Sequence, residues 1–314
     1  MSLCRVFLQE NSSGNTLGYM EASPRAKHVG RSTVLWQAML KFPMRMPTFI
    51  FWNVAGKSIQ ELIVSLAVSH QVDVLVLAEC NLDPSNLLKA LNSETAEYQY
   101  APGICRSLFF FTKFDSSFLT LMAETARVSI RCLRLPGRNE LLVVGAHLPS
   151  KIHFSQDSQI FECTELAKLI EEQEMKAGHR RTVLIGDLNV NPFEVGVVSS
   201  SGLHAVTTRD VALRGLRVVQ GRSHPFFYNP MWNYFGDRNE GTPGTFYYEK
   251  AEPLNYFWNT FDQVLIRPDV LGGFSKDGVR VVTEIGGTAL ADHRGRPDSQ
   301  NASDHFPVLL DIHF

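Results

Sequence analysis

Polar residues stand at the ends of several apolar runs of this sequence, and their types can bind a metal ion, move a proton or contact an anion. In chain order they are Asn53, Glu79, His147, Asp187 with Asn189, Asp262, and Asp304 with His305. Carboxylates are ligands that Mg²⁺ prefers, and imidazoles exchange protons near neutral pH. A strand that ends in such a residue presents it on a rigid scaffold, as sheet-based enzymes do.

Each of these residues has an ordinary structural interpretation when it is taken alone. An Asp or Asn after a strand is usually a turn former or a helix N-cap, and a single His there is usually a hydrogen-bonded structural residue. Glu79 is harder to explain in this way, because a carboxylate at the margin of a core needs a compensating cation or donors. The recurrence of the pattern along the chain favours one shared site.

Alternating strand and helix patterns begin at residue 48 and supply the elements that position this set. The apolar periodicity predicts strands at 48–52, 73–79, 107–112, 127–135, 140–147, 182–187, 260–266, 279–284 and 306–313. It predicts helices at 58–68, after the Asp83-Pro84 turn, and at 155–176 with Gly178 as the C-cap. The long helix is expected to bury Ile160, Phe161, Leu166, Leu169 and Ile170. Residues 222–258, dense in Gly, Pro and aromatic residues, are expected to form a surface excursion.

Residues 1–47 differ from the rest because they are polar and lack periodicity. They are either an N-terminal extension of doubtful order or the result of a mis-assigned start, with translation beginning at Met44 or Met46. The second interpretation is favoured. No linker or repeat follows, so 48–314 is predicted to be one domain.

The composition is that of a globular chain and excludes several classes of protein. Hydrophobic residues make up 44% and charged residues 20%, which argues against a mostly disordered chain. No apolar run approaches the roughly 18 residues that span a bilayer. The five cysteines are scattered without a C-x-x-C pair, which indicates a reducing compartment and favours a cytoplasmic protein.

The motifs that carry the polar residues resemble, in this order, those of the endonuclease/exonuclease/phosphatase superfamily, which includes deoxyribonuclease I. They are Phe51-Trp-Asn53, Leu77-Ala-Glu79, Gly145-Ala-His-Leu148, Gly186-Asp-Leu-Asn189, Phe261-Asp-Gln-Val-Leu-Ile266 and Ser303-Asp-His-Phe-Pro-Val308. The resemblance covers about residues 48–314. It implies a four-layer α/β/β/α sandwich, in which two mixed β-sheets pack face to face and helices cover them outside.

The resemblance also implies cleavage of a phosphoester with Mg²⁺ or Mn²⁺ as the cofactor. Such hydrolysis needs neutralised phosphate oxygens, a deprotonated water in line and a protonated leaving oxygen. Glu79 is expected to bind the metal, with Asn53 and Asp304 beside it. The expected catalytic residues are His147, Asp187, Asn189, Asp262 and His305.

The same resemblance gives each catalytic residue an expected role. Asp187 orients or deprotonates the attacking water, and Asn189 donates a hydrogen bond to a phosphoryl oxygen. Asp262 holds His305 in one tautomer and favours its charged form, so that His305 contacts the phosphate or moves a proton. His147 serves as a second acid or phosphate contact. The resemblance leaves two candidates for the general base, Asp187 and His305.

Departures from the superfamily pattern narrow the range of expected substrates. Ala55 stands where apurinic-site endonucleases usually carry an Asp, and His147 stands where they tend to have Tyr. Thr260-Phe-Asp-Gln263 lacks the Trp-Cys-Asp-Arg signature of inositol 5-phosphatases. These differences favour the deoxyribonuclease I and phosphatase side of the superfamily.

Basic residues near the motifs are candidates for contact with the substrate. The expected substrate-binding residues are Arg106, His293, Arg294 and Arg296. A second basic stretch comprises Arg209, Arg214, Arg217 and Arg222, and aromatic residues crowd 225–235. A nuclease would use such residues to track a backbone and stack bases. The alternative is that the arginines are solvated and the aromatic residues cover the edge of the core.

The leading prediction is a cytoplasmic, divalent-metal-dependent nuclease that acts on DNA or RNA by in-line water attack. The alternative is a phosphatase or phosphodiesterase for a small nucleotide, lipid or sugar phosphate, which the formal net charge of −2 keeps open. A non-catalytic binding protein on the same fold is the third interpretation, although no core position is degraded. Neither a membrane nor a protein partner is predicted.

Overall fold

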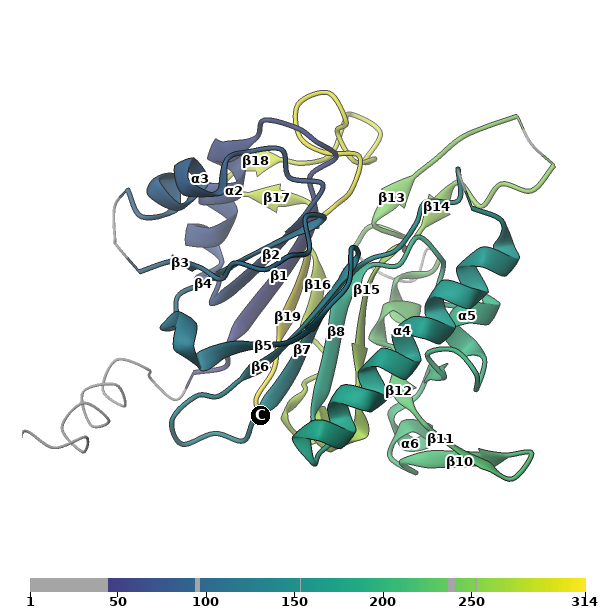
Figure 1. Ribbon diagram of the computed structural model, residues 1–314. Helices are drawn as coiled ribbons and strands as arrows, with labels where there is room; N and C mark the ends of the chain where they lie inside the picture. The colour runs from purple at the N-terminus through teal and green to yellow at the C-terminus, as the bar shows by residue number, and fades with distance from the viewer. Residues whose placement is uncertain (1–44, 94–96, 153, 237–240, 252) are drawn as a thin grey trace, which may run out of the picture. The chain divides into compact units, whose positions relative to one another are not determined.

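Two β-sheets form the frame of the computed structural model, which describes residues 45–93, 97–152, 154–236, 241–251 and 253–314 (Figure 1). The predicted N-terminal extension, 1–47, lies outside the described residues except for its last three. The first strand, β1, begins at Thr48, the residue at which the sequence predicts it.

The first sheet is mixed and has the strand order β16-β19-β1-β2-β4-β3. Its strands are β1 (Thr48–Asn53), β2 (Val74–Ala78), β3 (Gln99–Tyr100), β4 (Leu108–Thr112), β16 (Val279–Val281) and β19 (Val308–Asp311). β1 and β2 run parallel, whereas β19 and β4 are antiparallel to these neighbours. The parallel pair places the C-terminal ends of β1 and β2 at one edge of the sheet.

The second sheet is also mixed, with the order β5-β6-β7-β8-β15-β12-β9. Its strands are β5 (Leu119–Glu124), β6 (Val128–Leu133), β7 (Leu141–His147), β8 (Thr182–Asp187), β9 (Ala205–Val206), β12 (Phe227–Tyr228) and β15 (Asp262–Ile266). β7 and β8 are parallel, and β15 is antiparallel to β8. The end of β8 therefore lies between the end of β7 and the start of β15.

Smaller elements connect the strands of these sheets. The two-stranded pairs are β10 (Leu216–Val219) with β11 (Arg222–Pro225), β13 (Phe246–Tyr247) with β14 (Trp258–Asn259), and β17 (Glu284–Ile285) with β18 (Thr288–Ala289). The short helices are α5 (Val195–Val198), α6 (Arg209–Ala212), η1 (Ser116–Phe118), η2 (Pro230–Tyr234) and η3 (Pro268–Gly273).

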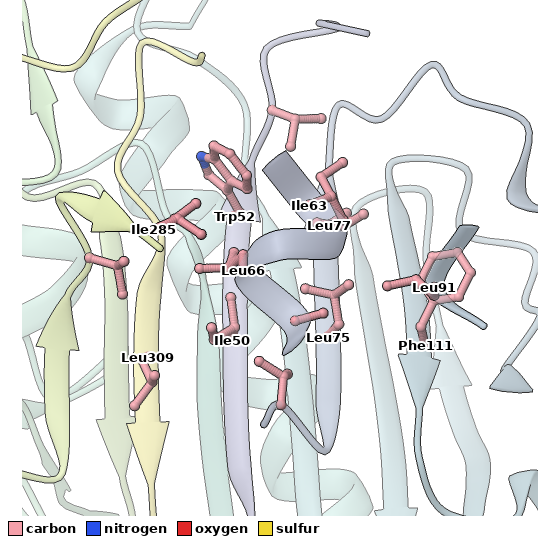
Figure 2. Packing of buried hydrophobic residues seen from close by; sticks show 14 of the residues in the cluster. Ile50, Trp52, Ile63, Leu66, Leu75, Leu77, Leu91, Phe111, Ile285 and Leu309 are labelled. Carbon is pink, nitrogen blue, oxygen red and sulfur yellow. The ribbon is translucent and has the colours of Figure 1, made fainter. Parts of the chain in front are cut away.

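Helices cover the outer faces of both sheets. α2 (Gln60–Ser69) and α3 (Pro84–Leu91) pack on the first sheet, where Ile63 and Leu66 of α2 meet Ile50 and Leu75 (Figure 2). α4 (Gln156–Ala177) packs on the second sheet through a cluster that includes Ile170. The strands are apolar on both faces because each sheet is covered on both.

The inner faces of the two sheets meet without helices between them. A Cβ on Gly145 of β7 would lie 2.6 Å from the ring of Phe110 and 3.4 Å from Val76, both in the first sheet. Only glycine allows this approach. The architecture is the predicted four-layer α/β/β/α sandwich, and no helix of the described residues is long and apolar enough to cross a membrane.

The long helix follows the sequence prediction at both ends and departs from it on one face. Ser155 caps the N-terminus by accepting from Ser158 N, and Gly178 ends the helix in the left-handed conformation, with φ 73°. The prediction that Phe161 faces inward is wrong, since its side chain is 60% exposed. The buried face of the helix instead includes Gln159 and Cys163, so it is rotated by about one residue from the predicted face.

The prediction of a surface excursion at 222–258 is wrong for its first part. Phe227 and Tyr228 form β12 inside the second sheet, and Met231 of η2 is fully buried. These aromatic residues cover the edge of the core, as the alternative interpretation holds. The predicted strand at 279–284 is also divided, because β16 pairs with β19 whereas β17 forms its own hairpin.

Candidate active site

Four elements bring polar side chains to the same end of the sandwich. Asn53 is the last residue of β1, and Glu79 follows β2, whose Ala78 pairs with Asn53. His147 ends β7 and pairs with Asp187 at the end of β8. Because parallel strands end at the same edge, each sheet contributes two neighbouring polar residues.

Close contacts join the residues of the two sheets. Asn53 Nδ2 donates to Asp187 Oδ2 at 3.0 Å and to Glu79 Oε1 at 3.3 Å. His147 Nε2 lies 3.1 Å from Glu79 Oε1 and 3.9 Å from Asp187 Oδ2. Asn53 and His147 therefore bridge a carboxylate of the first sheet to a carboxylate of the second.

His305 reaches this cluster from the loop that precedes β19. Its Nδ1 lies 2.8 Å from Oδ2 of Asp262, which opens β15 opposite Asp187. The loop is fastened at its backbone, since Trp52 Nε1 donates to His305 O at 2.9 Å and Ser303 Oγ donates to Asn53 O at 2.7 Å. The imidazole is thus held in one orientation with Nε2 facing away from Asp262.

Burial and charge act on the Asp262–His305 pair in opposite directions. Burial lowers the pKa of His305, but the Asp262 carboxylate and its hydrogen bond, with Asp187 and Asp304, outweigh this effect and raise the pKa to about 10. Burial raises the pKa of Asp262, and the charge of His305 opposes that rise. At neutral pH the imidazole is charged, so Nε2–H is a hydrogen-bond donor.

Glu79 is the most accessible carboxylate of the cluster. Its side chain is 46% exposed, whereas Asp187 and Asp262 are almost fully buried. The hydrogen bond from His147 lowers the pKa of Glu79, and partial burial opposes this only in part. An ionised carboxylate that faces solvent at the centre of the cluster suits a metal ion that keeps several waters.

The carboxylate oxygens and ring nitrogens of the cluster are suited to bind a divalent cation. Among the described residues, no Lys or Arg pairs with Glu79, Asp187 or Asp304, and buried oxygens of Asp262 and Asp304 lack a hydrogen-bond partner. Ligand atoms of Asp187, Asp262 and His305 also lie within 4.8 Å of one another. The charged ring of His305 compensates only one carboxylate, that of Asp262, and a divalent cation would relieve the cost of the others.

Two residues of the site have left-handed backbone, which side chains other than Gly seldom adopt. Glu79 has φ 50° and Asn189 has φ 53°. Asn189 is fixed there, because its N–H donates to Asp187 Oδ1 and its Nδ2 donates to Leu148 O, both at 2.9 Å. Strain of this kind is tolerated where a side chain has to point into a site.

The structure places the predicted substrate-binding residues at different distances from the cluster. Arg106 is exposed and precedes β4, whose Leu108 pairs with Ala78 beside Glu79. Arg296 stacks on the ring of Tyr247, with 3.8 Å from the guanidinium to the centroid. His293 and Arg294 are exposed and contact each other, with 3.2 Å from Arg294 Nε to His293 Nε2.

The second basic stretch lies at the other end of the sandwich. Arg209 donates to the backbone oxygens of Leu271 and Phe274, beyond the C-terminal end of β15, whereas Asp262 is at its N-terminal end. α6, β10 and β11 project from that far end (Figure 1). These arginines therefore do not border the cluster.

Three further residues border the cluster, although none of them stands at the end of an apolar run. Arg127 accepts a hydrogen bond from His147 N through its carbonyl oxygen at 2.9 Å. Lys151 follows β7, where its ammonium pairs with Glu194 and lies 5.3 Å from the centre of the Phe261 ring. The ring of Phe246 lies 4.7 Å from that of His305. Their signal is position alone, since each flanks an element that ends at the site.

Comparison with known proteins identifies the class to which this fold and cluster belong. A model of the endonuclease/exonuclease/phosphatase family matches residues 50–305. The chain therefore belongs to this family, and its fold is the deoxyribonuclease I-like α/β sandwich. Phosphoester hydrolysis is the general chemistry of the family. No curated protein sequence matches the chain significantly.

Solved structures of the same fold are distant in sequence. An endonuclease/exonuclease/phosphatase family protein from Bacteroides thetaiotaomicron is 14% identical, with 85% of this chain and 95% of that chain covered and a TM-score of 0.52. The 3′ phosphatase NExo from Neisseria, bound to a product DNA hairpin, is 16% identical, with 85% of this chain and 100% of that chain covered and a TM-score of 0.51. At this identity the likeness concerns the fold alone.

Proposed function

We propose that this protein is a Mg²⁺- or Mn²⁺-dependent phosphodiester hydrolase that cleaves DNA or RNA by in-line attack of water. One observation carries the proposal: polar side chains from both sheets and the 303–305 loop meet in a single cluster. Its members are Asn53, Glu79, His147, Asp187, Asp262 and His305. Their chemistry supplies metal ligands, a proton acceptor and hydrogen-bond donors within one small volume.

The metal is assigned to Glu79, whose exposed carboxylate is ionised. Asn53 orients that carboxylate through its amide, and Asp304 adds negative charge and an unpartnered oxygen nearby. A divalent cation bound there supplies positive charge that stabilises the phosphoryl oxygens as they gain charge.

Asp187 is the base in this proposal, and His305 is a donor. The carboxylates around His305 raise its pKa and favour the protonated ring, so His305 is assigned as the donor. Asp187 is oriented by donors on both oxygens, Asn53 Nδ2 on one and Asn189 N on the other. In this proposal the attacking water is bound by Asp187.

The remaining groups contact the phosphoryl oxygens or the leaving group. His305 Nε2–H carries a positive charge and is directed away from Asp262, so it donates to a phosphoryl oxygen. His147 contacts the phosphate or protonates the leaving oxygen. Asn189, which braces Asp187 through its backbone N–H, is expected to add a side-chain hydrogen bond to the phosphate.

A nucleic acid is the substrate class that the rim of the site favours. Basic residues flank elements that end at the site, namely Arg106, Arg127, Lys151 and Arg296, of which Lys151 pairs with Glu194 and Arg296 with Glu249. Positive charge around a scissile phosphate contacts the neighbouring phosphates of a polynucleotide. We place the enzyme in the cytoplasm, for which the scattered cysteines are the support.

A small phosphoester is the second candidate substrate. The observation in its favour is that Arg209 and the basic hairpin β10–β11 lie at the far end of the sandwich, so they cannot extend a nucleic-acid track. The formal net charge of −2 agrees with a small substrate.

Substrate panels separate these candidates. Purified protein with Mg²⁺ is incubated with plasmid, single-stranded DNA, RNA, bis-p-nitrophenyl phosphate and a set of small phosphomonoesters, each with an EDTA control. We expect metal-dependent cleavage of the polynucleotides and the diester. Turnover of small esters alone would assign the second candidate, and no turnover at all would favour a non-catalytic binding protein.

Replacement of the metal ligand tests the assignment directly. We expect Glu79→Gln to reduce metal-stimulated hydrolysis by more than about 100-fold, since even groups that only orient a metal ligand contribute 10- to 100-fold. Glu165→Gln, the same change at an exposed position of α4, is the matched control and should keep wild-type rates. Full activity of the Glu79 variant would remove this residue from the metal site.

A further inference from the structure

The loop at residues 102–107 joins β3 to β4 of the first sheet and contacts the second sheet. It leads into β4, whose Leu108 pairs with Ala78 of the first sheet. On the other side, Ser107 Oγ donates to the carbonyl oxygen of Ala126 at 2.8 Å, in the turn between β5 and β6 of the second sheet. The next residue of that turn, Arg127, bonds His147 N, so the loop stands next to the catalytic centre.

A buried carboxylate holds this loop through its backbone. Glu124 Oε2 accepts from Ile104 N at 2.5 Å and from Cys105 N at 3.2 Å. Its other oxygen, Oε1, accepts from Ser129 Oγ at 2.6 Å and from Arg131 Nη2 at 3.1 Å. Only 2% of the Glu124 side chain is exposed, so both oxygens are committed to these donors.

Arg131 completes the attachment from the neighbouring strand. It balances the charge of Glu124 and donates to Pro102 O at 3.2 Å, with its guanidinium 4.7 Å from the centre of the Phe110 ring. A side chain on Gly103 would overlap the Glu124 carboxylate, so only glycine fits between them. The loop is therefore clamped at both ends and in the middle.

The clamped loop presents side chains that do not take part in its own attachment. Arg106 is exposed and makes no ion pair with another described residue, and Ile104 is 78% exposed. A buried ion pair is an expensive way to hold a surface loop, because its desolvation consumes much of its Coulombic energy. What this pair provides is a fixed position for Arg106, two residues before Leu108, which pairs with Ala78 next to Glu79 in the chain.

We propose that Glu124 is a positioning residue that holds loop 102–107 as a rigid arm, from which Arg106 binds a phosphate of a nucleic-acid strand next to the one that is cleaved. The inference rests on the proposed function and names its substrate class. Rigid presentation matters, since a preorganised guanidinium loses less entropy when it binds a phosphate.

Binding experiments that need no turnover test the arm. The dissociation constant of a fluorescent single-stranded oligonucleotide is measured by anisotropy over a series of salt concentrations, without metal. We expect Arg106→Ala to reduce the slope of log Kd against log salt by about 0.7, the value for one lost phosphate contact on a single strand. Arg217→Ala, on the exposed β10 strand at the far end, is the matched control and should leave the slope unchanged.

Two further variants test the positioning role of Glu124. Glu124→Gln and, independently, Gly103→Ala are each expected to cause the same loss of slope as Arg106→Ala, with KM for the oligonucleotide raised and kcat kept. The double variant Glu124→Gln/Arg106→Ala should lose no more than either single variant, because both remove one contact. If Glu124→Gln does not fold, Gly103→Ala and Arg106→Ala still decide the question.

Three results would overturn the inference. The first is an Arg106→Ala slope equal to that of the wild type. The second is additive loss in the double variant, and the third is an equal loss of kcat on oligonucleotide and bis-p-nitrophenyl phosphate; either of these would make Glu124 a merely structural residue. Failure of the proposed function looks different, since the wild-type protein would then lack metal-dependent hydrolysis of the diester.

Discussion

The Asp262–His305 pair shows how neighbouring charges decide the protonation of a buried histidine. Burial by itself would leave the imidazole neutral, and the carboxylates around it raise its pKa to about 10. Asp262 is the strongest of these carboxylates and the only one in hydrogen-bond contact, at 2.8 Å. When Asp262 is replaced, burial therefore becomes the dominant effect on the pKa of the His305 ring.

Asp262→Asn is expected to move the pH dependence of catalysis. Without the carboxylate the pKa of His305 falls, so the charged donor form is lost as pH rises through the new, lower value. In the wild-type protein that form persists up to about pH 10. We expect kcat/KM at about pH 8 to decrease about 100-fold, the range for loss of a positioned proton donor.

The measurements are kcat/KM against pH and the nitrogen chemical shifts of the His305 ring. Asp157→Asn, an exposed position in the first turn of α4, is the control and should keep the wild-type profile. A profile of Asp262→Asn that stays flat through alkaline pH would contradict the assignment of His305 as a charged donor.

Residues of the cluster are predictable from sequence because each lies at one end of an apolar run, after it as Asn53 and Asp187 do, or before it as Asp262 does. The surrounding residues are not, for a physical reason. Glu124 accepts from backbone N–H groups of a loop 20 residues away in the chain, and Arg127 accepts from His147 N through its own carbonyl oxygen. Phe246, in the short hairpin β13–β14, contacts the ring of His305. Contacts of this kind depend on tertiary packing and leave no period in the sequence.

At the scale of elements, the regular helices and the long buried strands are predictable and the short or half-exposed ones are not. β8 and α4 have clear apolar runs and caps, and both lie where the sequence predicts them. β5 is missed because most of its residues are partly or fully exposed, which blurs the alternation. β12 has two residues, too few for any period, and is recognised only by its pairing with β15 and β9.

A buried ion pair fastens the long helix to the second sheet. Glu174 of α4 accepts from Arg267 Nε at 2.8 Å and from Thr182 Oγ1 at 2.7 Å, and both charged side chains are 2% exposed. Arg267 also donates to two backbone oxygens and lies over Phe227, with 3.8 Å to the ring centroid. Loss of one partner leaves the other charge buried and unpaired.

We expect Glu174→Gln to lower the free energy of unfolding by about 3 kcal/mol, the range for a broken buried pair. Urea denaturation measures the change. The double variant Glu174→Gln/Arg267→Met should recover part of the loss, because it no longer buries a charge. Glu140→Gln, which breaks the exposed Arg134–Glu140 pair, is the control and should cost less than about 1 kcal/mol. Equal losses at the two positions would contradict this account.

At the scale of the molecule, the active site is also a seam between the two sheets. Asn53 joins Asp187 across it, His147 joins Glu79, and His305, from the loop before β19 of the first sheet, contacts Asp262 of the second. The overall charge of the chain is close to zero, yet this seam gathers carboxylates with few cations among them. Their mutual repulsion opposes the approach of the two sheets.

A divalent cation should therefore stabilise the whole fold, and this can be measured without any substrate. Binding to the native state alone adds RT ln(1 + [L]/Kd), about 2.7 kcal/mol when Mg²⁺ is at about 100 times its Kd. We expect thermal and urea unfolding to shift by this amount on addition of Mg²⁺ and to return on addition of EDTA.

Variants assign that stabilisation to a part of the seam. In Glu79→Gln the Mg²⁺-dependent shift should disappear, while apo stability falls slightly, because the hydrogen bond that lowers the pKa of Glu79 favours its carboxylate in the folded state. Glu165→Gln, outside the seam, should keep the full shift. A shift that persists in Glu79→Gln but vanishes in Asp262→Asn would place the ion at the Asp187, Asp262 and His305 group instead, where the ligand atoms already lie within 4.8 Å of one another.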